Sequence, residues 1–256
     1  MVIENHIGWY ALYRKEIIRF LSVYIQTFLT PVISAFLFLG IAHLTVAKLA
    51  LTVNNFPYTH FLVPGLCAMA MAMSAFSNPS FSLLLSKLQR NLPSIIMAPL
   101  SSFEFYSAYV LAATTRGMLT GAAVWLSLSL VTQFNANNFF YFILFSFLGS
   151  LLFAQIGYIA GIVAKRFEHL SAMMTFVITP LTFLSGGFYL QATLPETIRQ
   201  LAHGNPVFYF MDGVRGSLLG INESSFMISF FVLVLINISL GYGAMRLTKS
   251  GYNLKQ

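Results

Sequence analysis

The chain has 256 residues, of which 57% are hydrophobic and only 8% are charged. Soluble domains carry about 25% charged residues, so this chain has too few charges to cover a water-exposed surface. Its net charge of +7 does not indicate a nucleic-acid partner, because the 14 basic residues are scattered and no soluble domain carries them. Cys67 is the single cysteine, which excludes an intrachain disulfide and a cysteine metal cage. The composition predicts a protein that crosses the lipid bilayer several times.

Continuously apolar stretches of about 20 residues, each long enough to cross a bilayer, make up most of the chain. They lack the alternating pattern of barrel strands, so we expect an all-α polytopic fold in one domain, 1–256. Six transmembrane helices are predicted, at about 21–44, 61–85, 105–132, 139–164, 170–190 and 226–245.

An amphipathic segment, 6–20, precedes the first predicted span. Apolar side chains recur there at helical spacing, at Trp9, Leu12, Tyr13, Ile17 and Phe20. The basic residues Arg14, Lys15 and Arg19 fall on other faces. We expect an interfacial helix on the cytoplasmic leaflet that can push on its neighbours. The alternative is a flank that only orients the first span.

Basic residues are distributed unevenly between the two sides that six spans create. One side carries ten, namely Arg14, Lys15, Arg19, Lys87, Arg90, Lys165, Arg166, Arg246, Lys249 and Lys255. The other side carries three, Lys48, Arg199 and Arg215. Loops rich in Lys and Arg stay in the cytoplasm, so both termini are expected there.

Motifs for catalysis are not found in the sequence. It contains neither a Gly-x-x-x-x-Gly-Lys-Ser/Thr phosphate loop nor a His-Glu-x-x-His motif, and its five histidines show no ligand spacing. We therefore expect no enzyme, and no metal or cofactor bound by this chain. None of the seven carboxylates falls well inside a predicted span, which argues against ion-driven transport. An ATP-independent secondary transporter or channel stays open as an alternative.

Arg116 is the charged residue that falls within a predicted span. At the centre of a lipid-facing helix it would cost about 2.5–3.5 kcal/mol. We expect it to lie at the inner boundary, where its side chain can reach water at little cost. The alternative places it at a helix–helix contact in the inner half of the bundle.

The region after the fifth span is unusually apolar for an outer loop. Pro180 and Ser185-Gly186-Gly187 are expected to break the span near its outer end. Pro195 and Pro206 are placed like helix starts, which predicts two short re-entrant or interfacial helices at 195–203 and 206–219. An outer loop packed flat on the bundle is the alternative.

The connection between spans two and three, 86–102, is the counterpart on the cytoplasmic side. Pro93 starts a short apolar turn and Pro99 stops it. Ile95, Ile96 and Met97 would be costly to expose to water, so this piece is expected to dock against a partner, or else against the membrane surface.

Three sets of residues together resemble the permease subunits of ABC-2 type transporters, and within that family a branch of small bacterial members. The first set is FLSGGFY at 183–189, Leu194-Pro195, NPVFY at 205–209 and DGVR at 212–215, in family order. The second is Gln89-Arg90-Asn91 followed by APLS at 98–101, and the third is the six-span layout with an amphipathic head. The likeness covers nearly the whole chain.

The resemblance implies an exporter in a bacterial inner membrane, with two permease copies and two separate ATPase subunits that hold ATP and Mg. The implied ATPase-coupling segment contains Lys87, Gln89, Arg90, Asn91, Ile95, Ile96 and Pro99. The implied outer gate contains Ser185, Gly186, Gly187, Leu194, Pro195, Pro206, Tyr209, Asp212 and Arg215. Coupling segments of the family often carry an acid, whereas Leu92-Pro93-Ser94 stands here, so the polar contact would rest on Arg90, Lys87 or backbone groups. The few charges in the spans suit an amphipathic, lipid-linked or apolar cargo better than an ion.

Overall fold

The computed structural model describes residues 6–46, 52–53, 56–132, 136–189 and 195–253. Nearly all of them are helical, as predicted. In chain order the elements are α1 (His6–Leu21), the π-helical turn η1 (Ile25–Leu29), α2 (Thr30–Val46), β1 (Thr52–Val53), β2 (Phe56–Pro57), α3 (Tyr58–Leu88), α4 (Leu92–Ile96), α5 (Ser102–Thr132), α6 (Phe139–Val163), α7 (Phe167–Met173), the π-helical turn η3 (Met174–Ile178), α8 (Thr179–Leu184), α9 (Glu196–His203), α10 (Pro206–Leu219) and α11 (Phe226–Ser250).

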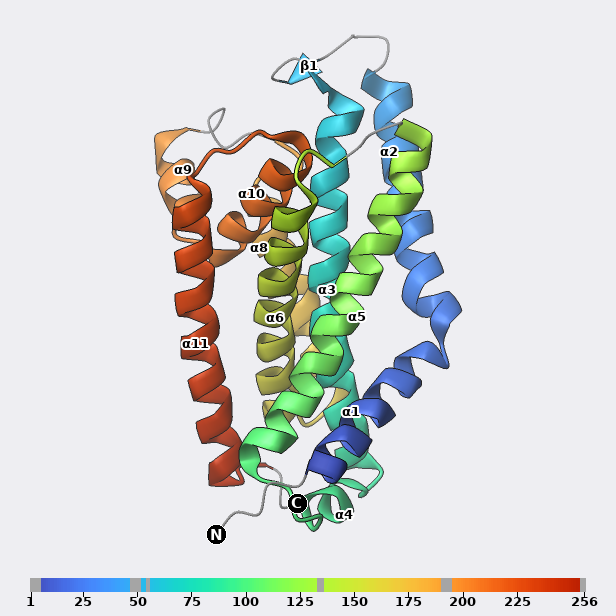
Figure 1. The fold of residues 1–256 in the computed structure, drawn as a ribbon, viewed down its shortest axis with the longest axis vertical. Coiled ribbons are helices and arrows are strands. Elements are labelled where there is room, and N and C mark those ends of the chain that lie inside the picture. The colour runs from blue at the N-terminus through green and yellow to red at the C-terminus, as the bar shows by residue number, and fades with distance from the viewer. Residues whose placement is uncertain (1–5, 47–51, 54–55, 133–135, 190–194, 254–256) are drawn as a thin grey trace.

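The centre of the bundle is α3, which packs against both α5 and α6 (Figure 1). Its contact with α6 is close because α6 presents glycines. A Cβ atom at Gly157 would lie 2.2 Å from the carbonyl oxygen of Phe76, and one at Gly161 would lie 2.9 Å from the Cα of Ser80. Small residues let helix backbones approach closely where the hydrophobic effect cannot drive association. These three helices therefore form the core, and most of α2 and α11 lies outside it.

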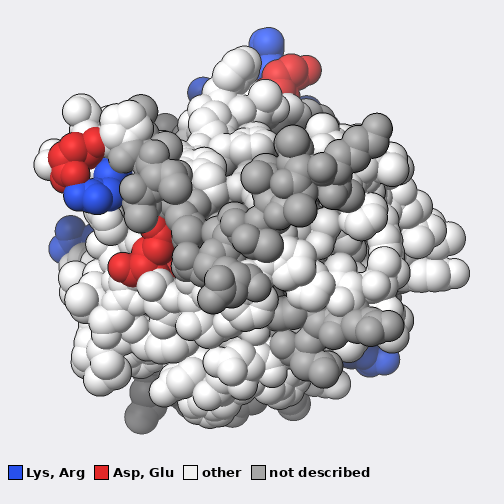
Figure 2. Space-filling model, turned by 90° about the horizontal axis from the view of Figure 1, so that it is seen from above, with Lys and Arg blue, Asp and Glu red and all other residues white. Residues whose placement is uncertain are grey.

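The two ends of the bundle carry different elements. Helices α1 and α4 and the last turns of α11 lie at one end, which we call the α4 end (Figure 1). The opposite end, the α9 end, carries α9 and the paired strands β1 and β2. These two-residue strands were not predicted, because they are too short to show a periodic pattern. Seen from above, the α9 end is mostly uncharged, with small acidic and basic groups near its edge (Figure 2).

Proline shapes the first and fifth spans in the same way. The π turn η1 leads into Thr30-Pro31, and the π turn η3 leads into Thr179-Pro180. Proline has no N–H to donate, so a helix changes its hydrogen-bond pattern in the turn before it. Pro64 and Pro79, by contrast, lie inside α3 without ending it.

Some predicted boundaries were wrong. The first span begins at Ile25 instead of residue 21, because a turn separates it from α1. The fifth ends at Leu184 instead of residue 190, because Gly186 adopts a left-handed backbone with φ of 77°. Helix α11 continues past residue 245 to Ser250. The predicted starts of α6, α10 and α11 agree with the structure.

Within the described residues, five helical segments are long and apolar enough to cross a membrane. They are Ile25–Thr45, Tyr58–Leu88, Phe139–Val163, Phe167–Leu184 and Phe226–Ser250. Helix α5 has 31 residues and is therefore about 46 Å long, but it is not among the five. The predicted sixth span thus depends on α5, which carries Arg116 and several Ser and Thr residues.

Candidate functional site

A buried arginine ties three segments together at the α9 end. Arg215 of α10 is only 1% exposed. Its Nη1 donates a hydrogen bond to Oε1 of Glu223 at 3.0 Å, and its Nη2 donates to the carbonyl oxygen of Gly186. The guanidinium carbon also lies 4.7 Å from the ring centre of Phe61 in α3. The planar fork of arginine suits this role, because it can serve several partners in fixed directions.

Asp212 lies one turn before Arg215 and orders the connection between α10 and α11. It too is 1% exposed. Its two carboxyl oxygens accept hydrogen bonds from the backbone N–H groups of Glu223 and Ser224, both at 2.9 Å. Burial raises the pKa of this carboxyl above its ordinary value, and the two backbone donors oppose that shift.

Asn205 joins the start of α10 to the end of α8. Its Oδ1 accepts from the backbone N–H of Val207 at 3.0 Å, which caps the helix. Its Nδ2 donates to the carbonyl oxygen of Leu181 and to Oγ of Ser185, both at 2.9 Å. The Asn-Pro pair therefore fixes where α10 begins and what it touches.

The loop after α8 lies directly on α3. A Cβ atom at Gly65 would lie 2.0 Å from the carbonyl oxygen of Gly187, so these two backbones leave no room for a side chain. Nearby, the hydroxyl of Tyr58 donates to the carbonyl oxygen of Phe188 at 3.1 Å.

The structure thus brings together five of the predicted gate residues, and Asn205 and Glu223 complete the group. We call it the outer cluster: Ser185, Gly186, Gly187, Asn205, Asp212, Arg215 and Glu223. Pro206 begins α10, and the Tyr209 hydroxyl donates to the carbonyl oxygen of His203 at 3.1 Å. Pro195 is exposed and precedes α9. Leu194 lies outside the described residues.

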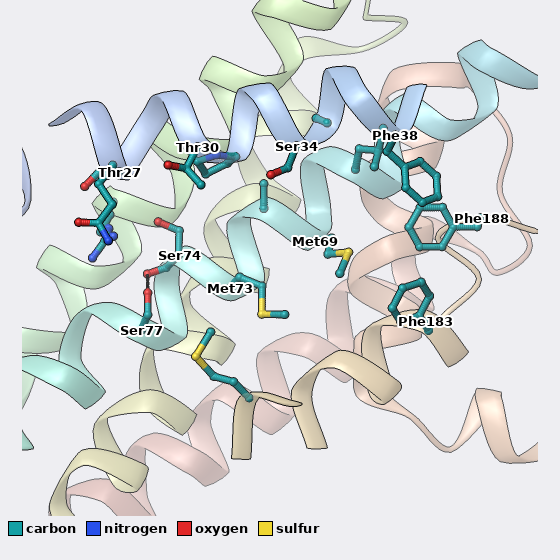
Figure 3. A pocket seen from close by; sticks show the side chains of 17 residues that line it. Thr27, Thr30, Ser34, Phe38, Met69, Met73, Ser74, Ser77, Phe183 and Phe188 are labelled. Atoms are coloured by element: carbon teal, nitrogen blue, oxygen red, sulfur yellow. Dashed lines mark hydrogen bonds between the residues drawn. The ribbon is translucent and has the colours of Figure 1, made fainter. Parts of the chain in front are cut away.

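A cavity of about 540 Å³ opens between α2, α3 and the segment that contains α8. Figure 3 shows its graded lining. Thr27, Ser74 and Ser77 lie toward one end and Phe38, Phe183 and Phe188 toward the other, with methionines between them. Its walls are Gln26, Thr27, Thr30, Pro31, Ser34, Ala35, Phe38, Leu66, Met69, Ala70, Met73, Ser74, Ser77, Arg116, Met174, Phe183 and Phe188.

Arg116 takes part in this cavity. It is half-buried at the contact between α5 and α3. Its Nη1 donates to Oδ1 of Asn78 at 3.3 Å. The helix–helix contact expected in the alternative is therefore present, and its depth in the membrane stays a prediction.

Asn78 also accepts hydrogen bonds from a second arginine, which lies in the head helix α1. Arg19 donates through Nη2 to Asn78 Oδ1 at 2.7 Å and to its carbonyl oxygen at 2.9 Å. Arg19 also pairs with Glu16 at 2.9 Å, and Glu16, fully buried, accepts from Oγ of Ser82 at 2.9 Å. The prediction that Arg19 points away from the buried face was wrong, because Glu16 brings a buried carboxylate to that face.

The rest of the head helix docks along α5 as an amphipathic helix. Trp9 donates to Oγ of Ser107 at 2.9 Å, and the Tyr13 hydroxyl lies 3.1 Å from Oγ1 of Thr115. Arg14 and Lys15 are exposed, as predicted. Most other exposed side chains of α1 are apolar, including those of Ile7, Tyr10 and Ile18, which suits contact with lipid.

The connection between α3 and α5 folds as a short helix at the α4 end. Gln89, Arg90 and Asn91 are exposed, and Arg90 has a left-handed backbone with φ of 57°. In α4, Ile95 packs on the core, whereas Met97 just beyond the helix is 85% exposed. Pro99 is exposed too, and Ile96 lies in α4.

Ser101 and Glu104 fix where α5 begins. The Ser101 hydroxyl accepts from the backbone N–H of Glu104 at 3.1 Å. The Glu104 carboxylate in return accepts from the Ser101 N–H at 2.7 Å. This reciprocal cap satisfies backbone groups in the first turn of α5.

Lys87 turns away from α4 and toward α6. Its Nζ donates to the carbonyl oxygens of Gly161 and Ile162, and to that of Ala164 at 3.3 Å. A cation at the C-terminal end of a helix satisfies carbonyl groups that have no partner within the helix. Lys87 therefore binds carbonyl groups of its own chain, and Arg90 is the exposed cation of this segment.

Several residues of these sites were missed by the reasoning from sequence. Glu16, Asn78 and Glu223 looked like ordinary polar residues of the head, a span and an outer loop. The one available signal was that Asn78 precedes a proline inside an apolar run, where an amide needs a partner. Their pairings join segments far apart in the sequence, so no local pattern could reveal them.

Apolar helices long enough to span a bilayer, a graded cavity between three of the segments, a docked head helix at one end and a polar cluster at the other define a polytopic membrane protein. The family profile described as ABC-2 type transporter matches residues 8–219. The chain belongs to this family.

Curated relatives agree with that assignment. The chain is 32% identical to the inner membrane transport permease YadH of Escherichia coli K12, over 98% of this chain and 99% of the relative. It is 21% identical to nodulation protein J of Rhizobium leguminosarum bv. viciae, over 84% of this chain and 83% of the relative. Nodulation protein J of Rhizobium meliloti is 22% identical over the same shares.

Proposed function

We propose that this chain is the membrane-spanning subunit of an ATP-binding-cassette exporter in a bacterial inner membrane. In this proposal α5 supplies the sixth span and both termini face the cytoplasm. Two copies of the chain form the translocation path, and two separate ATPase subunits bind ATP and Mg beneath it. Family membership and the inner-membrane relative support the location, and the uneven distribution of basic residues supports the orientation.

The observation that carries the proposal is the form of the α3–α5 connection. A short helix stands at the α4 end, with Ile95 packed on the core and with Gln89, Arg90, Asn91 and Met97 exposed around it. A helix end with an exposed apolar residue among polar ones is suited to dock against a partner and to receive force from it. We assign this role to α4, with Arg90 as the main polar contact.

Motion at α4 would reach the rest of the subunit through α3. Closure of the ATPase pair on ATP would shift α4 and tilt the first, second and fifth spans against the second permease copy. The outer cluster joins α3, α8 and α10, so it is placed to open or close the α9 end. ATP can bias this equilibrium only if the ATPase pair binds it more tightly in one of the two states.

The second copy is expected on the side where burial within one chain is low. Only 17% of the most apolar stretch in each of Ile25–Thr45 and Phe167–Leu184 is buried, and 22% of that in Phe226–Ser250, against 72% in α3. Lipid or a second copy must cover these faces.

The test is co-purification of the tagged chain with an ATP-binding-cassette ATPase from its native host, followed by measurement of ATP turnover in the complex. Arg90→Glu is expected to lower both complex yield and turnover by about tenfold, since a reversed charge at a docking contact is repelled. Lys249→Glu, at the exposed end of α11, is the matched control and should change neither. Intact assembly and turnover in the Arg90 variant would remove α4 from the coupling role.

A secondary transporter or channel predicts a different result. The purified chain, reconstituted alone, would then move cargo without an ATPase, and ATP depletion with ion gradients held constant would have no effect.

A further inference from the structure

The cavity between α2, α3 and the α8 segment has the chemistry of a site for an anionic amphiphile. Its volume of about 540 Å³ falls within the roughly 300–1,000 Å³ of small-molecule pockets. One part of the lining is apolar and aromatic, with Phe38, Phe183 and Phe188, and another is made of hydroxyl groups. Flexible methionines, such as Met69 and Met73, separate the two and can adapt to a chain of varied shape.

The polar part of the cavity also carries an excess of positive charge. Arg116 lines it, and Arg19 lies on the far side of the shared Asn78 amide oxygen. Glu16 forms an ion pair with Arg19 but, within the described part of the chain, no carboxylate lies within 4.0 Å of Arg116. The Nε of Arg116 is buried and has no hydrogen-bond partner among the same residues. An arginine held in this way in a low-dielectric region favours an anion beside it.

We infer that this cavity binds an amphiphile with one anionic head group and an aliphatic tail. The head lies at Arg116 with the hydroxyl groups of Ser74 and Ser77 nearby, and the tail runs past Met69 and Met73 toward the three phenylalanines. The inference rests on the proposed function where it treats the ligand as cargo, because a lipid that resides in the cavity would satisfy the same chemistry.

Photo-cross-linking tests the binding with the permease alone, in nanodiscs of phosphatidylcholine. The probe is lysophosphatidic acid with a diazirine near the end of its tail, and the control is a monoacylglycerol with the same tail. The charged probe should label peptides that contain Phe38, Phe183 and Phe188 about ten- to a hundredfold more strongly than the neutral one, because charged hydrogen bonds are worth about 1.5–3 kcal/mol.

Three variants separate charge from fold. Arg116→Gln should lose the preference for the charged probe, and Arg116→Lys should restore most of it. Ala70→Phe, which fills the apolar part, should reduce labelling by both probes alike. The thermal midpoint of each variant shows that it remains folded. Equal labelling by the two probes, or an unchanged preference in Arg116→Gln, would overturn the inference.

A second arm uses the complex with the ATPase and separates cargo from resident lipid. If the amphiphile is cargo, it raises ATP turnover, ATP clears the label, and Arg116→Gln removes both effects. If it is a resident lipid, the label persists with ATP and turnover does not respond. Both outcomes uphold the site. Failure to assemble with any ATPase contradicts the proposed function but leaves the binding result readable.

Discussion

At the scale of single residues, the contact between Gly65 and Gly187 sets how closely the loop after α8 can lie on α3. Gly65→Ala would place a Cβ atom 2.0 Å from the carbonyl oxygen of Gly187, and a backbone atom cannot rotate away. We expect a loss of about 1–3 kcal/mol in stability. The measurement is the thermal midpoint of the purified protein.

Gly40→Ala is the matched control for this change. A Cβ at Gly40 in α2 meets nothing within 4 Å, and alanine favours a helix. Its thermal midpoint should stay the same or rise. Equal midpoints for the two variants would show that the loop is not held against α3.

Arg215 offers a second prediction at this scale. Arg215→Met removes the hydrogen bonds to Gly186 and Glu223 and should cost about 3–5 kcal/mol, as breaking a buried ion pair does. Arg215→Lys keeps the charge but lacks the planar guanidinium that donates to both partners, so it should recover only part of the lost stability. Thermal unfolding and limited proteolysis of the α10–α11 connection measure both. Proteolysis unchanged in Arg215→Met would mean that the outer cluster does not hold this loop.

The two buried charged clusters differ in how far sequence could predict them. Asp212 and Arg215 stand in a motif that resembles the family, so their importance was foreseen although their partners were not. Glu16 and Asn78 lie in no such motif. Glu16 and Arg19 of α1 contact Ser82 and Asn78 of α3, so these hydrogen bonds join residues about sixty positions apart.

At the scale of elements, Lys87 links the end of α3 to the end of α6. Lys87→Met keeps the aliphatic stem but leaves the carbonyl groups of Gly161, Ile162 and Ala164 without this donor. We expect a loss of about 1–3 kcal/mol, the cost of a buried polar group without its partner.

The control is Lys249→Met, which removes an exposed charge from the last turn of α11. It should change the thermal midpoint little, because exposed charges contribute little to stability. If both variants unfold at the wild-type temperature, the cap on α6 does not contribute to stability.

Elements that begin at a proline were predicted well, and elements that end on a tertiary contact were not. Pro195 and Pro206 marked α9 and α10 because proline is favoured in a first turn. The fifth span ends early where the backbone of Gly186 turns toward Arg215, which no apolar pattern records. The π turns η1 and η3 could not be predicted, because the sequence shows a proline but not the hydrogen-bond pattern before it.

At the scale of the whole molecule, the orientation of the protein in the membrane can be tested by labelling introduced cysteines. The native Cys67 is buried, and replacing it leaves the introduced thiol as the only one. In a Cys67→Ala background, Met97→Cys places a thiol near α4 and Thr197→Cys places one on α9, and both positions are exposed. With both termini cytoplasmic, a membrane-impermeant maleimide added to intact spheroplasts should label the α9 position. The α4 position should react only after the membrane is opened. The reverse pattern would place the basic ends outside.

The paired π turns have a consequence for how such a subunit can flex. Each is a widened loop of helix that holds one surplus residue, and each borders the same cavity, through Thr27 on one side and Met174 on the other. Weakly closed turns of this kind serve as pivots, whereas the glycine-packed contact of α3 with α6 is rigid. We expect α2 and α8 to move about these pivots while α3 stays in place. The opening of the cavity could then change without disturbing the packing of α3 against α6.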